Sequence, residues 1–565
     1  MTDNFDHVVD VLVVGSGAGG MSSAWSSAAR GLDTLVIEKA AVYGGSTSLS
    51  GGGSWIPNAP QLVAEGERDD PELLLKYMRT IAPDVAPERQ RRYLQEAPRL
   101  LQALAKTKAF HKGFFWVKGY SDYHPDKGGN PKGRGVWASP IDLRLLGEDA
   151  ASLRGGHARL PGAPDGLWVT TSDVRDLLAL RWGTWRGRFV MFRLAWRILV
   201  TRIRGAKMQA SGAALITRWR LALKELGVPL WCETPMRSLI TDESGRVTGV
   251  LAERNGKTIR IGARSGVVLA AGGFEHNAEM REQYQPEVAG KGWSSGSPDN
   301  VGDGIRAGQD IGAAVDLMDD AWWMPSMQLP DSVRPTVFER SFPNQFIVNG
   351  DGRRFTNEAA PYTDFVHDLL AGHRAGVNHI PVYMIMDHYA WTHNLIVGHL
   401  PGTAMPPEWL ESGLVSRADT LEELAEKIGL PPQNLVATAE RFNGFARQAR
   451  DDDFHRGESA YDNFYGNAKY PNPNLAEVNK PPYYAFTFLP GDLGTKGGLL
   501  TDENARVLNG DGSPITGLFS VGNNSASVMG NSYAGPGATI GPAMTFGWIA
   551  ANYLADQKAG NSDST

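Results

Sequence analysis

The start of the chain alternates between apolar runs and one glycine-rich turn. Val8–Val14 and Thr34–Glu38 are largely apolar runs of strand length, and Met21–Arg30 between them has the length and small-residue content of a helix. Gly15–Gly20 lies between the first strand and this helix. The order of strand, glycine turn, helix and strand predicts the beginning of a parallel α/β sheet.

Elements of the same kind return later in the chain. The predicted ones are a helix at Leu215–Leu226, a strand at Val228–Cys232, two short strands around the turn that begins at Asp242, a strand at Gly266–Ala271 that runs into Gly272-Gly273, a strand at Gly517–Val521, and a helix that begins near Pro542. The stretch from 321 to 490 is richer in aromatic residues and proline and loses this rhythm. We therefore expect it to form a separate unit, inserted into a fold that the last segment completes.

Length and charge narrow the class of protein. A chain of 565 residues is too long for one typical core, which favours two domains. The net charge of −6 is not the basic balance that nucleic-acid binding favours. The single cysteine, Cys232, excludes an intramolecular disulfide and fits a reducing cytosol. Its strand-like surroundings favour a packing role over a thiol nucleophile.

The hydrophobic pattern contains neither a secretory signal nor an apolar run long enough to span a membrane, so we expect a cytoplasmic protein. Phe189–Val200 is the nearest approach to such a run. It contains Arg193 and Arg197 and is flanked by Arg186, Arg188, Arg202 and Arg204. An interfacial helix with weak peripheral membrane contact is one interpretation. A surface helix with snorkelling arginines is the other, and the sequence alone favours it.

The turn Gly15-Ser-Gly17-Ala-Gly19-Gly20 matches G-x-G-x-x-G and lies between a strand and a helix, as dinucleotide binding requires. Gly15 permits the tight turn, Gly17 lets the backbone approach a pyrophosphate, and Gly20 allows the helix to pack closely on the strand. The helix N-terminus offers amides and a positive dipole to the phosphates. Glu38 ends the second strand, where an acid binds a ribose hydroxyl.

Further motifs resemble the fumarate reductase and 3-ketosteroid dehydrogenase superfamily of flavoproteins. They are, in order, Glu38-Lys39 with the small and hydroxyl-bearing run to Gly53, Ala270-Ala-Gly-Gly-Phe274, Gly302-Asp-Gly304, Thr495-Lys-Gly-Gly-Leu499 and Gly517–Gly522. The resemblance covers nearly the whole chain and implies FAD. It carries no motif for residues 139–210. No His or Cys occurs in the early glycine-rich segment, so we expect FAD to be bound non-covalently.

The predicted fold is α/β, with a Rossmann-like FAD-binding domain that is discontinuous in sequence and an inserted α+β catalytic cap domain. The FAD-binding domain takes residues 1–320 and 491–565, and the cap takes 321–490. The residues expected to contact FAD are Gly15, Gly17, Ala18, Gly19, Gly20, Glu38, Lys39, Gly45, Ser46, Thr47, Ser48, Gly52, Gly53, Met236, Ala271, Gly272, Gly273, Asp303, Gly522, Asn523, Gly537, Ala538 and Ile540.

Three tyrosine motifs resemble those of the 3-ketosteroid 1-dehydrogenases. They are the run from Trp116 to Pro125 with Tyr120 and Tyr123, the run from Phe355 to Tyr362, and the run from Asn531 to Pro542 with Tyr533 and Gly537. In that family three tyrosines and one glycine amide form the active site. The resemblance therefore assigns catalysis to Tyr123, Tyr362, Tyr533 and Gly537, and it leaves open whether Tyr120 takes the place of Tyr123.

The chemistry of a 3-ketosteroid 1-dehydrogenase implies distinct roles for these groups. The flavin N5 accepts a hydride from C1, and a base removes the C2 proton. Tyr533 and the Gly537 amide would polarise the C3 carbonyl as an oxyanion hole. Tyr362 would act as a tyrosinate base, and a hydrogen bond from Tyr123 would lower its pKa. An alkaline optimum would follow.

Three alternatives compete with this function. A 3-ketosteroid 4-dehydrogenase would use a different C-terminal constellation. A fumarate reductase-like enzyme would need arginines and histidines around a dicarboxylate, whereas Arg353-Arg354 fits the tip of a hairpin and His367, His373 and His379 have no obvious partners. The third alternative is a flavoprotein that only passes electrons to a partner. We expect a 3-ketosteroid as substrate and an electron acceptor that the sequence does not identify.

Overall fold

The computed structural model describes residues 5–155, 167–173, 185–330 and 332–562. Its largest sheet has the strand order β20-β21-β11-β1-β2-β8, with β10 beside β11 and β9 beside β10. The bounds are β1 His7–Val14, β2 Thr34–Ile37, β8 Leu230–Trp231, β9 Met236–Thr241, β10 Val247–Arg254, β11 Lys257–Leu269, β20 Arg506–Leu508 and β21 Pro514–Ser520. Strands β8, β2, β1, β11 and β21 pair in parallel, as the sequence predicts for its core.

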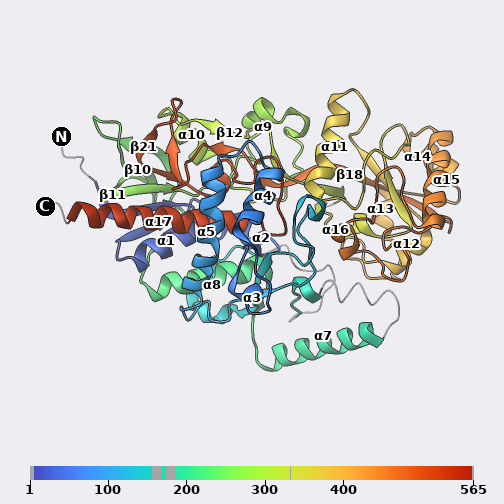
Figure 1. Ribbon diagram of the computed structural model, residues 1–565, viewed down its shortest axis with the longest axis horizontal. Helices are drawn as coiled ribbons and strands as arrows, with labels where there is room; N and C mark the ends of the chain where they lie inside the picture. Colours follow the sequence, from blue (N-terminus) through green and yellow to red (C-terminus); the bar gives the residue numbers. More distant parts are fainter. Residues whose placement is uncertain (1–4, 156–166, 174–184, 331, 563–565) are drawn as a thin grey trace.

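Helix α17 (Ile540–Ser562) joins the C-terminal segment to the N-terminal fold. It packs along α1 (Ala18–Ala29), which also contacts α8 (Ser211–Glu225), and Figure 1 shows α1 and α17 side by side. The Ser22 hydroxyl donates to the Met544 carbonyl oxygen at 2.6 Å. Asp10 of β1, almost fully buried, pairs with Arg264 and with Lys558 of α17. Helix α17 is thus held against α1 and β1 by packing, by a hydrogen bond and by an ion pair with the buried Asp10.

The second sheet comes from the middle of the chain and is antiparallel. Its order is β14-β13-β18-β16-β15, with β17 also paired to β18. The bounds are β13 Ala321–Gln328, β14 Val333–Pro335, β15 Gln345–Val348, β16 Val382–Met386, β17 Val415–Ala418 and β18 Tyr483–Thr495. In Figure 1 its helices α11 (Tyr362–Arg374), α14 (Leu421–Ile428) and α15 (Pro432–Gln448) lie at the end of the molecule away from α17. Strand β18 runs past residue 490.

The remaining helices of the site region come from the first part of the chain and from the segment after β7 (Met208–Gln209). Helix α2 (Gly45–Leu49) precedes the small sheet of β3 (Gly53–Trp55), β5 (Gly135–Ala138) and β4 (Phe114–Trp116). Helices α3 (Pro60–Val63), α4 (Pro71–Ile81) and α5 (Pro87–Leu104) lie between β3 and β4 in the chain. Within the described ranges, no helix combines the length and the apolar character needed to cross a membrane.

Element boundaries differ from the sequence expectations where glycines or loops take part. Helix α1 begins at Ala18, because the end of the glycine turn already has helical conformation. Strand β11 begins nine residues before the expected Gly266, at Lys257, since its first half pairs with β10. The expected strand at 228–232 shrinks to Leu230–Trp231.

The prediction that Arg353-Arg354 forms the tip of a hairpin is wrong. A turn is present, since the Asn349 amide donates to the Arg353 carbonyl, but the next regular element after β15 is α11 and not a returning strand. Arg353 is exposed, whereas the Arg354 side chain is buried and pairs with Glu358 and Asp451, each at 2.7 Å. A buried guanidinium needs such partners. The Glu358 carboxylate also accepts from the Ile347 amide and so braces β15.

Candidate active site

One cavity of about 1130 Å³ runs from the carboxyl ends of the parallel strands toward the second sheet. Its wall comes from segments that are far apart in the sequence: the first glycine turn, the run from Gly45 to Gly53, residues 294–300, and the loop before α17. Ligands of open α/β sheets bind at this edge of the strands. Tyr123, Tyr362 and Tyr533 line the same cavity, so a bound nucleotide and a bound substrate would share one continuous space.

The glycine turn after β1 has the geometry that close approach to a phosphate requires. Gly15 has φ +108°, and an added Cβ would lie 2.2 Å from the Ala270 carbonyl oxygen. At Gly20 an added Cβ would lie 2.0 Å from the Gly15 carbonyl oxygen, so α1 touches the turn directly. At Gly17 an added Cβ would meet, within the described part of the chain, just the Thr47 hydroxyl, at 3.7 Å. The backbone at Gly17 therefore borders the cavity at the N-terminus of α1, where amides attract anions.

Glu38 lies just after β2 and faces this turn. One carboxylate oxygen accepts from the Ser16 amide at 3.1 Å and from the Ser16 hydroxyl at 2.5 Å, and the other accepts from the Ala40 amide at 3.0 Å. Next to it, Lys39 pairs with Asp303 at 2.5 Å. Glu38, Lys39 and Asp303 all line the cavity, so the expected ribose-binding acid borders the space that a nucleotide would occupy.

The expected FAD contacts divide into a lining group and a supporting group. Those that line the cavity are Gly15, Gly17, Ala18, Gly19, Glu38, Lys39, Gly45, Ser46, Thr47, Gly52, Gly53, Met236, Ala271, Gly272, Asp303, Gly522, Asn523, Gly537 and Ile540. Gly20, Ser48, Gly273 and Ala538 are not part of the wall. The Ser48 hydroxyl, for example, donates to the Arg154 carbonyl at 2.6 Å, and Gly273 packs against Thr495.

Sequence reasoning missed part of this wall. Residues 294–300 line it, and the Ser46 hydroxyl accepts from the Ser297 amide at 2.8 Å and from the Asn300 side chain at 3.0 Å. Arg154 also borders the cavity and pairs with Asp299. The small polar run Ser294-Ser-Gly-Ser297, just before Gly302-Asp-Gly304, is the signal that would have found this segment.

The three predicted tyrosines meet in one buried cluster. Tyr123 follows β4, Tyr362 is the first residue of α11, and Tyr533 lies in the loop before α17. Their side chains are 3–4% exposed. The Tyr123 hydroxyl donates to the Tyr362 hydroxyl at 2.8 Å. The ring centroids lie 5.2 Å apart for Tyr123 and Tyr362, 5.0 Å for Tyr123 and Tyr533, and 5.3 Å for Tyr362 and Tyr533.

Tyr120 takes a different position. The centroid of its ring lies 4.4 Å from that of Phe464 and 5.6 Å from that of Trp137, and both pairs are stacked. The hydrogen bond to Tyr362 comes from Tyr123. Of the two candidates, Tyr123 therefore has the contact that the helper role requires.

Burial dominates the protonation of this cluster. Removal from water raises the pKa of Tyr362 well above its ordinary value, neighbouring tyrosines act in the same direction, and the hydrogen bond from Tyr123 lowers it. Burial also raises the pKa of Tyr533, against the lowering effect of its hydrogen bond with Thr539. Burial favours the protonated forms of Tyr123 and Tyr533, which suits them as hydrogen-bond donors. A tyrosinate at Tyr362, in contrast, needs hydrogen bonds that stabilise its charged form.

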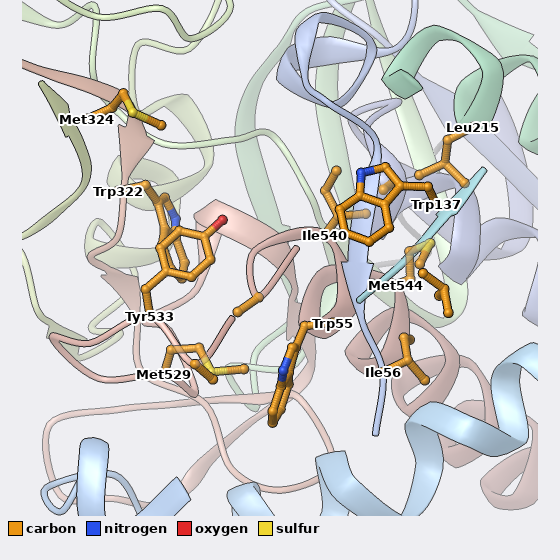
Figure 2. Packing of buried hydrophobic residues seen from close by; sticks show 14 of the residues in the cluster. Trp55, Ile56, Trp137, Leu215, Trp322, Met324, Met529, Tyr533, Ile540 and Met544 are labelled. Carbon is orange, nitrogen blue, oxygen red and sulfur yellow. The ribbon is translucent and has the colours of Figure 1, made fainter. Parts of the chain in front are cut away.

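Gly537 and Tyr533 belong to one wall of the cavity. Gly537 has φ +90°, and its carbonyl accepts from the Trp55 amide at 3.0 Å. Over the described ranges, its own amide has no protein acceptor, and the residue lines the cavity. The Tyr533 hydroxyl lies 3.0 Å from the Thr539 hydroxyl, a neighbour that the sequence did not indicate. Figure 2 shows the Tyr533 ring beside Trp322, with its hydroxyl pointing away from Met529.

A buried ion pair supports the Tyr533 loop from behind. The Lys496 ammonium, fully buried, donates to Asp320 at 2.9 Å and to the Ser532 carbonyl at 3.3 Å, and lies 4.9 Å from the centroid of the Trp322 ring. His367 also contacts Asp320, at 2.9 Å. Burial raises the pKa of Asp320, but Lys496 and His367 more than offset this and hold it at about 2.

Two of the three histidines expected to have no obvious partners therefore have them. His367 contacts Asp320, and His379 contacts the Asn349 side chain at 3.2 Å and the Leu369 carbonyl at 3.1 Å. Neither lines the cavity. These two rings are therefore engaged in hydrogen bonds outside the cavity wall and do not form a dicarboxylate site there.

Comparison with known proteins gives consistent matches over the full length. Residues 10–540 match the family model described as FAD binding domain. The chain is 44% identical to a 3-oxosteroid 1-dehydrogenase of Mycobacterium tuberculosis, over 97% of this chain and 98% of the relative. It is 34% identical to a 4-oxocyclohexanecarboxylate 2-dehydrogenase of Sinomonas cyclohexanicum, over 98% of this chain and 94% of the relative.

A solved structure is similar over the same extent. The crystal structure of 3-ketosteroid delta1-dehydrogenase from Sterolibacterium denitrificans in complex with 1,4-androstadiene-3,17-dione superposes with a TM-score of 0.91. The two chains are 39% identical, and the alignment covers 98% of this chain and 100% of the other.

We predict that Lys496→Met destabilises the protein by about 3–5 kcal/mol at neutral pH, because it leaves Asp320 buried without its main cation. In the wild type, Asp320 has a folded pKa below its unfolded value of 3.8, so its stabilising contribution is present above pH 4. In the variant the folded pKa of Asp320 rises above the unfolded value, so the penalty grows as pH rises from 4. Thermal unfolding from pH 4 to pH 8 measures the difference.

The gap between wild type and Lys496→Met should narrow as pH falls toward 4. Lys480→Met, at an exposed lysine, is the matched control and should unfold like the wild type. A gap of the same size at pH 4 and pH 8 would show that the pairing with Asp320 is not what Lys496 contributes.

Proposed function

The chain belongs to the 3-oxosteroid 1-dehydrogenase family of FAD-binding proteins, and we propose that it removes hydrogen from C1 and C2 of a 3-ketosteroid. The observation that carries this is the buried tyrosine cluster at the end of the nucleotide cavity, with Tyr123 hydrogen-bonded to Tyr362 and Tyr533 against both rings. A dehydrogenation at a ketone needs a base and a carbonyl donor side by side, and this cluster offers both.

The residues around the glycine turn fit FAD. The open backbone at Gly17 and the N-terminus of α1 would hold the pyrophosphate, and Glu38 would hold a ribose hydroxyl. Ser46, Thr47 and the loop from Gly522 would line the path toward the tyrosines. When bound, FAD supplies the acceptor for the C1 hydride at its N5 atom.

Tyr533 and the Gly537 amide form the oxyanion hole in this proposal. Burial keeps the Tyr533 hydroxyl protonated, and Thr539 orients it. The Gly537 amide has no competing protein acceptor over the described ranges and borders the cavity. Two donors that face the C3 oxygen stabilise the enolate that forms when C2 loses its proton, and in a dry site each is worth more than in water.

Tyr362 takes the C2 proton, and Tyr123 is its helper. A buried phenol is a poor base, because burial raises its pKa. The Tyr123 hydroxyl donates to the Tyr362 oxygen and so favours the tyrosinate. Activity should therefore rise with pH, as the base loses its proton.

The region from 321 to 490 acts as the catalytic cap in this proposal, inserted into an FAD-binding domain of residues 1–320 and 491–565. It supplies Tyr362, and it also supplies part of the cavity wall, namely Val333, Arg334, Pro335, Val337, Phe338, Leu395, Val397 and Gly398. This wall is apolar apart from a few groups and extends the cavity beyond the tyrosines. A flat, apolar, four-ring substrate would use that extension.

A smaller ring ketone is the second candidate substrate, because the relative from Sinomonas cyclohexanicum is named for one. It would react at the same tyrosines but leave the wall at Phe338 and Val397 without contact. Anaerobic mixing with androst-4-ene-3,17-dione or with 4-oxocyclohexanecarboxylate separates the two. Flavin bleaching and a product lighter by two hydrogens are expected with the steroid; bleaching by the cyclohexanone alone would favour the smaller substrate.

We predict that Tyr362→Phe abolishes dehydrogenation and also the exchange of the C2 hydrogen with deuterated water, because both need the base. Tyr123→Phe should retain slow activity with a pH profile moved to higher pH, since the base loses the hydrogen bond that lowers its pKa. Steady-state rates from pH 6 to pH 10 and mass spectrometry of recovered substrate measure both effects.

The assignment of roles depends on the order of these effects. Tyr484→Phe is the matched control: Tyr484 is a buried cap tyrosine of β18 that does not line the cavity. It should leave rate and pH profile unchanged. If Tyr123→Phe is inactive and Tyr362→Phe keeps a shifted profile, the roles are exchanged; normal C2 exchange in both variants would remove the tyrosinate base from the mechanism.

We predict that Tyr533→Phe lowers turnover by about 10²–10³ while FAD stays bound, because only one carbonyl donor is lost. The ring itself, which packs on Trp322, remains. Single-turnover reduction of the flavin measures the chemical step directly. Turnover near that of the wild type would exclude Tyr533 from the oxyanion hole.

A further inference from the structure

A chain of three polar side chains runs behind the tyrosine cluster. The His124 ring lies in its middle: the Nε2 atom is 3.2 Å from the Ser532 hydroxyl, and the Nδ1 atom is 3.6 Å from the Asp364 carboxylate. His124 and Ser532 are buried, at 4% and 8% exposure, whereas the Asp364 side chain is 35% exposed. None of the three lines the cavity, so the chain lies outside the space that a substrate would occupy.

Each member of the chain lies beside a tyrosine of the cluster in the sequence. These neighbours are Tyr123 with His124, Tyr362 with Asp364 two residues later, and Tyr533 with Ser532. The three segments are a loop after β4, the first turn of α11, and the loop before α17. The chain therefore connects the backbones that carry the three tyrosines, at the point where α11 meets the two loops.

The partners of His124 determine where its proton lies. Burial lowers the pKa of His124, against the raising effect of Asp364, and this favours a neutral ring. A carboxylate only accepts hydrogen bonds, so the proton belongs on the Nδ1 atom, which faces Asp364. The Nε2 atom is then an acceptor, and the Ser532 hydroxyl donates to it.

Ser532 is also held from its other side. Its carbonyl accepts from the Lys496 ammonium at 3.3 Å, Lys496 pairs with Asp320, and His367 of α11 contacts the same carboxylate. Two chains of polar contacts thus lead from α11 to Ser532, one through His124 and one through Asp320 and Lys496. The tyrosine that follows Ser532 cannot move relative to α11 without disturbing one of them.

We propose that His124 is a positioning residue for the oxyanion hole: by holding the Ser532 hydroxyl and facing Asp364, it fixes Tyr533 relative to the base on α11. This rests on the proposed function, in which Tyr533 polarises the C3 carbonyl while Tyr362 takes the C2 proton. Both groups must reach one substrate at the same time, and a small displacement of a reacting group lowers the rate strongly. His124 acts through Tyr533 and not on the substrate.

A double-mutant cycle separates this role from simple packing. In the FAD-loaded protein, His124→Leu should slow single-turnover flavin reduction by saturating androst-4-ene-3,17-dione about tenfold. In the Tyr533→Phe background the same change should cost less than about twofold, because the hydroxyl that His124 positions is already absent. A loss of stability or packing would instead act in both backgrounds, so an equal cost in the two would overturn the proposal.

Ser532→Ala allows the same cycle if His124→Leu does not fold, since it removes a single oxygen atom. It should also cost about tenfold alone and less than about twofold together with Tyr533→Phe. His124→Gln keeps an acceptor for the Ser532 hydroxyl and should be at least about threefold faster than His124→Leu. A glutamine variant as slow as the leucine variant would count against the hydrogen bond.

His379→Leu and Ser22→Ala are the matched controls. Both residues are buried, have hydrogen bonds of their own and lie outside the cavity wall. Each variant should reduce its flavin within about twofold of the wild-type rate. Controls as slow as His124→Leu and Ser532→Ala would overturn the proposal, because any buried polar group would then have the same effect.

The tautomer of His124 gives a readout that needs no substrate. Nitrogen NMR spectra of the FAD-loaded protein, labelled at histidine, should contain a neutral ring protonated on Nδ1 whose signal is missing in His124→Gln. The opposite tautomer would overturn the donation from Ser532 and the proposal with it. A wild type that has the expected tautomer but does not oxidise the steroid would count against the proposed function alone.

Discussion

A phenol that leaves water holds its proton more tightly, and this constraint governs the arrangement of the site. Tyr362 is 4% exposed, and burial raises its pKa well above the ordinary value. The same burial makes Tyr533 a dependable donor, because it keeps its proton. In the proposed mechanism, one environment thus favours the carbonyl donor, Tyr533, and opposes the base, Tyr362. In that mechanism the hydrogen bond from Tyr123 to Tyr362 would offset part of this effect of burial.

The position of that hydrogen bond depends on how the second sheet is joined to the first. The strands that enter and leave the middle region are neighbours, since Ala321 of β13 pairs with Thr495 of β18. Beside this junction, Lys496 reaches Asp320 and the Ser532 carbonyl, next to Tyr533. Small changes at the junction would therefore move Tyr362, on α11, relative to Tyr533. A buried ion pair at this point resists such movement, because separating its charges in a dry interior is costly.

The sequence predicted those features whose signal is local. The first strand, the turn and the helix lie in the contiguous residues Val8–Arg30, so their pattern is visible in the sequence. This pattern predicted the parallel pairing of β1 and β2 that the structure shows. The tyrosines could be found only through motifs that resemble a known family, because nothing in their spacing brings Tyr123 and Tyr362, 239 residues apart, into contact. Lys496 belongs to a motif that the sequence revealed, but its ion pair with Asp320 could not be predicted. Asp320 lies 176 residues away, and no periodicity connects the two positions.

Helix α7 (Trp185–Ile203) illustrates the opposite limit of sequence reasoning. Its amphipathic pattern was visible, but a pattern does not say which face the fold covers, and the sequence alone favoured snorkelling arginines over an apolar contact surface. The structure shows a surface helix whose buried side is the narrow one at Val190 and Leu194, with its aromatic side in solvent. Exposed tryptophan and phenylalanine cost free energy in water. Buried contacts at Val190 and Leu194 and the Asp173 ion pairs hold these residues outward, so the surrounding fold, and not the pattern alone, decides which face of α7 is exposed.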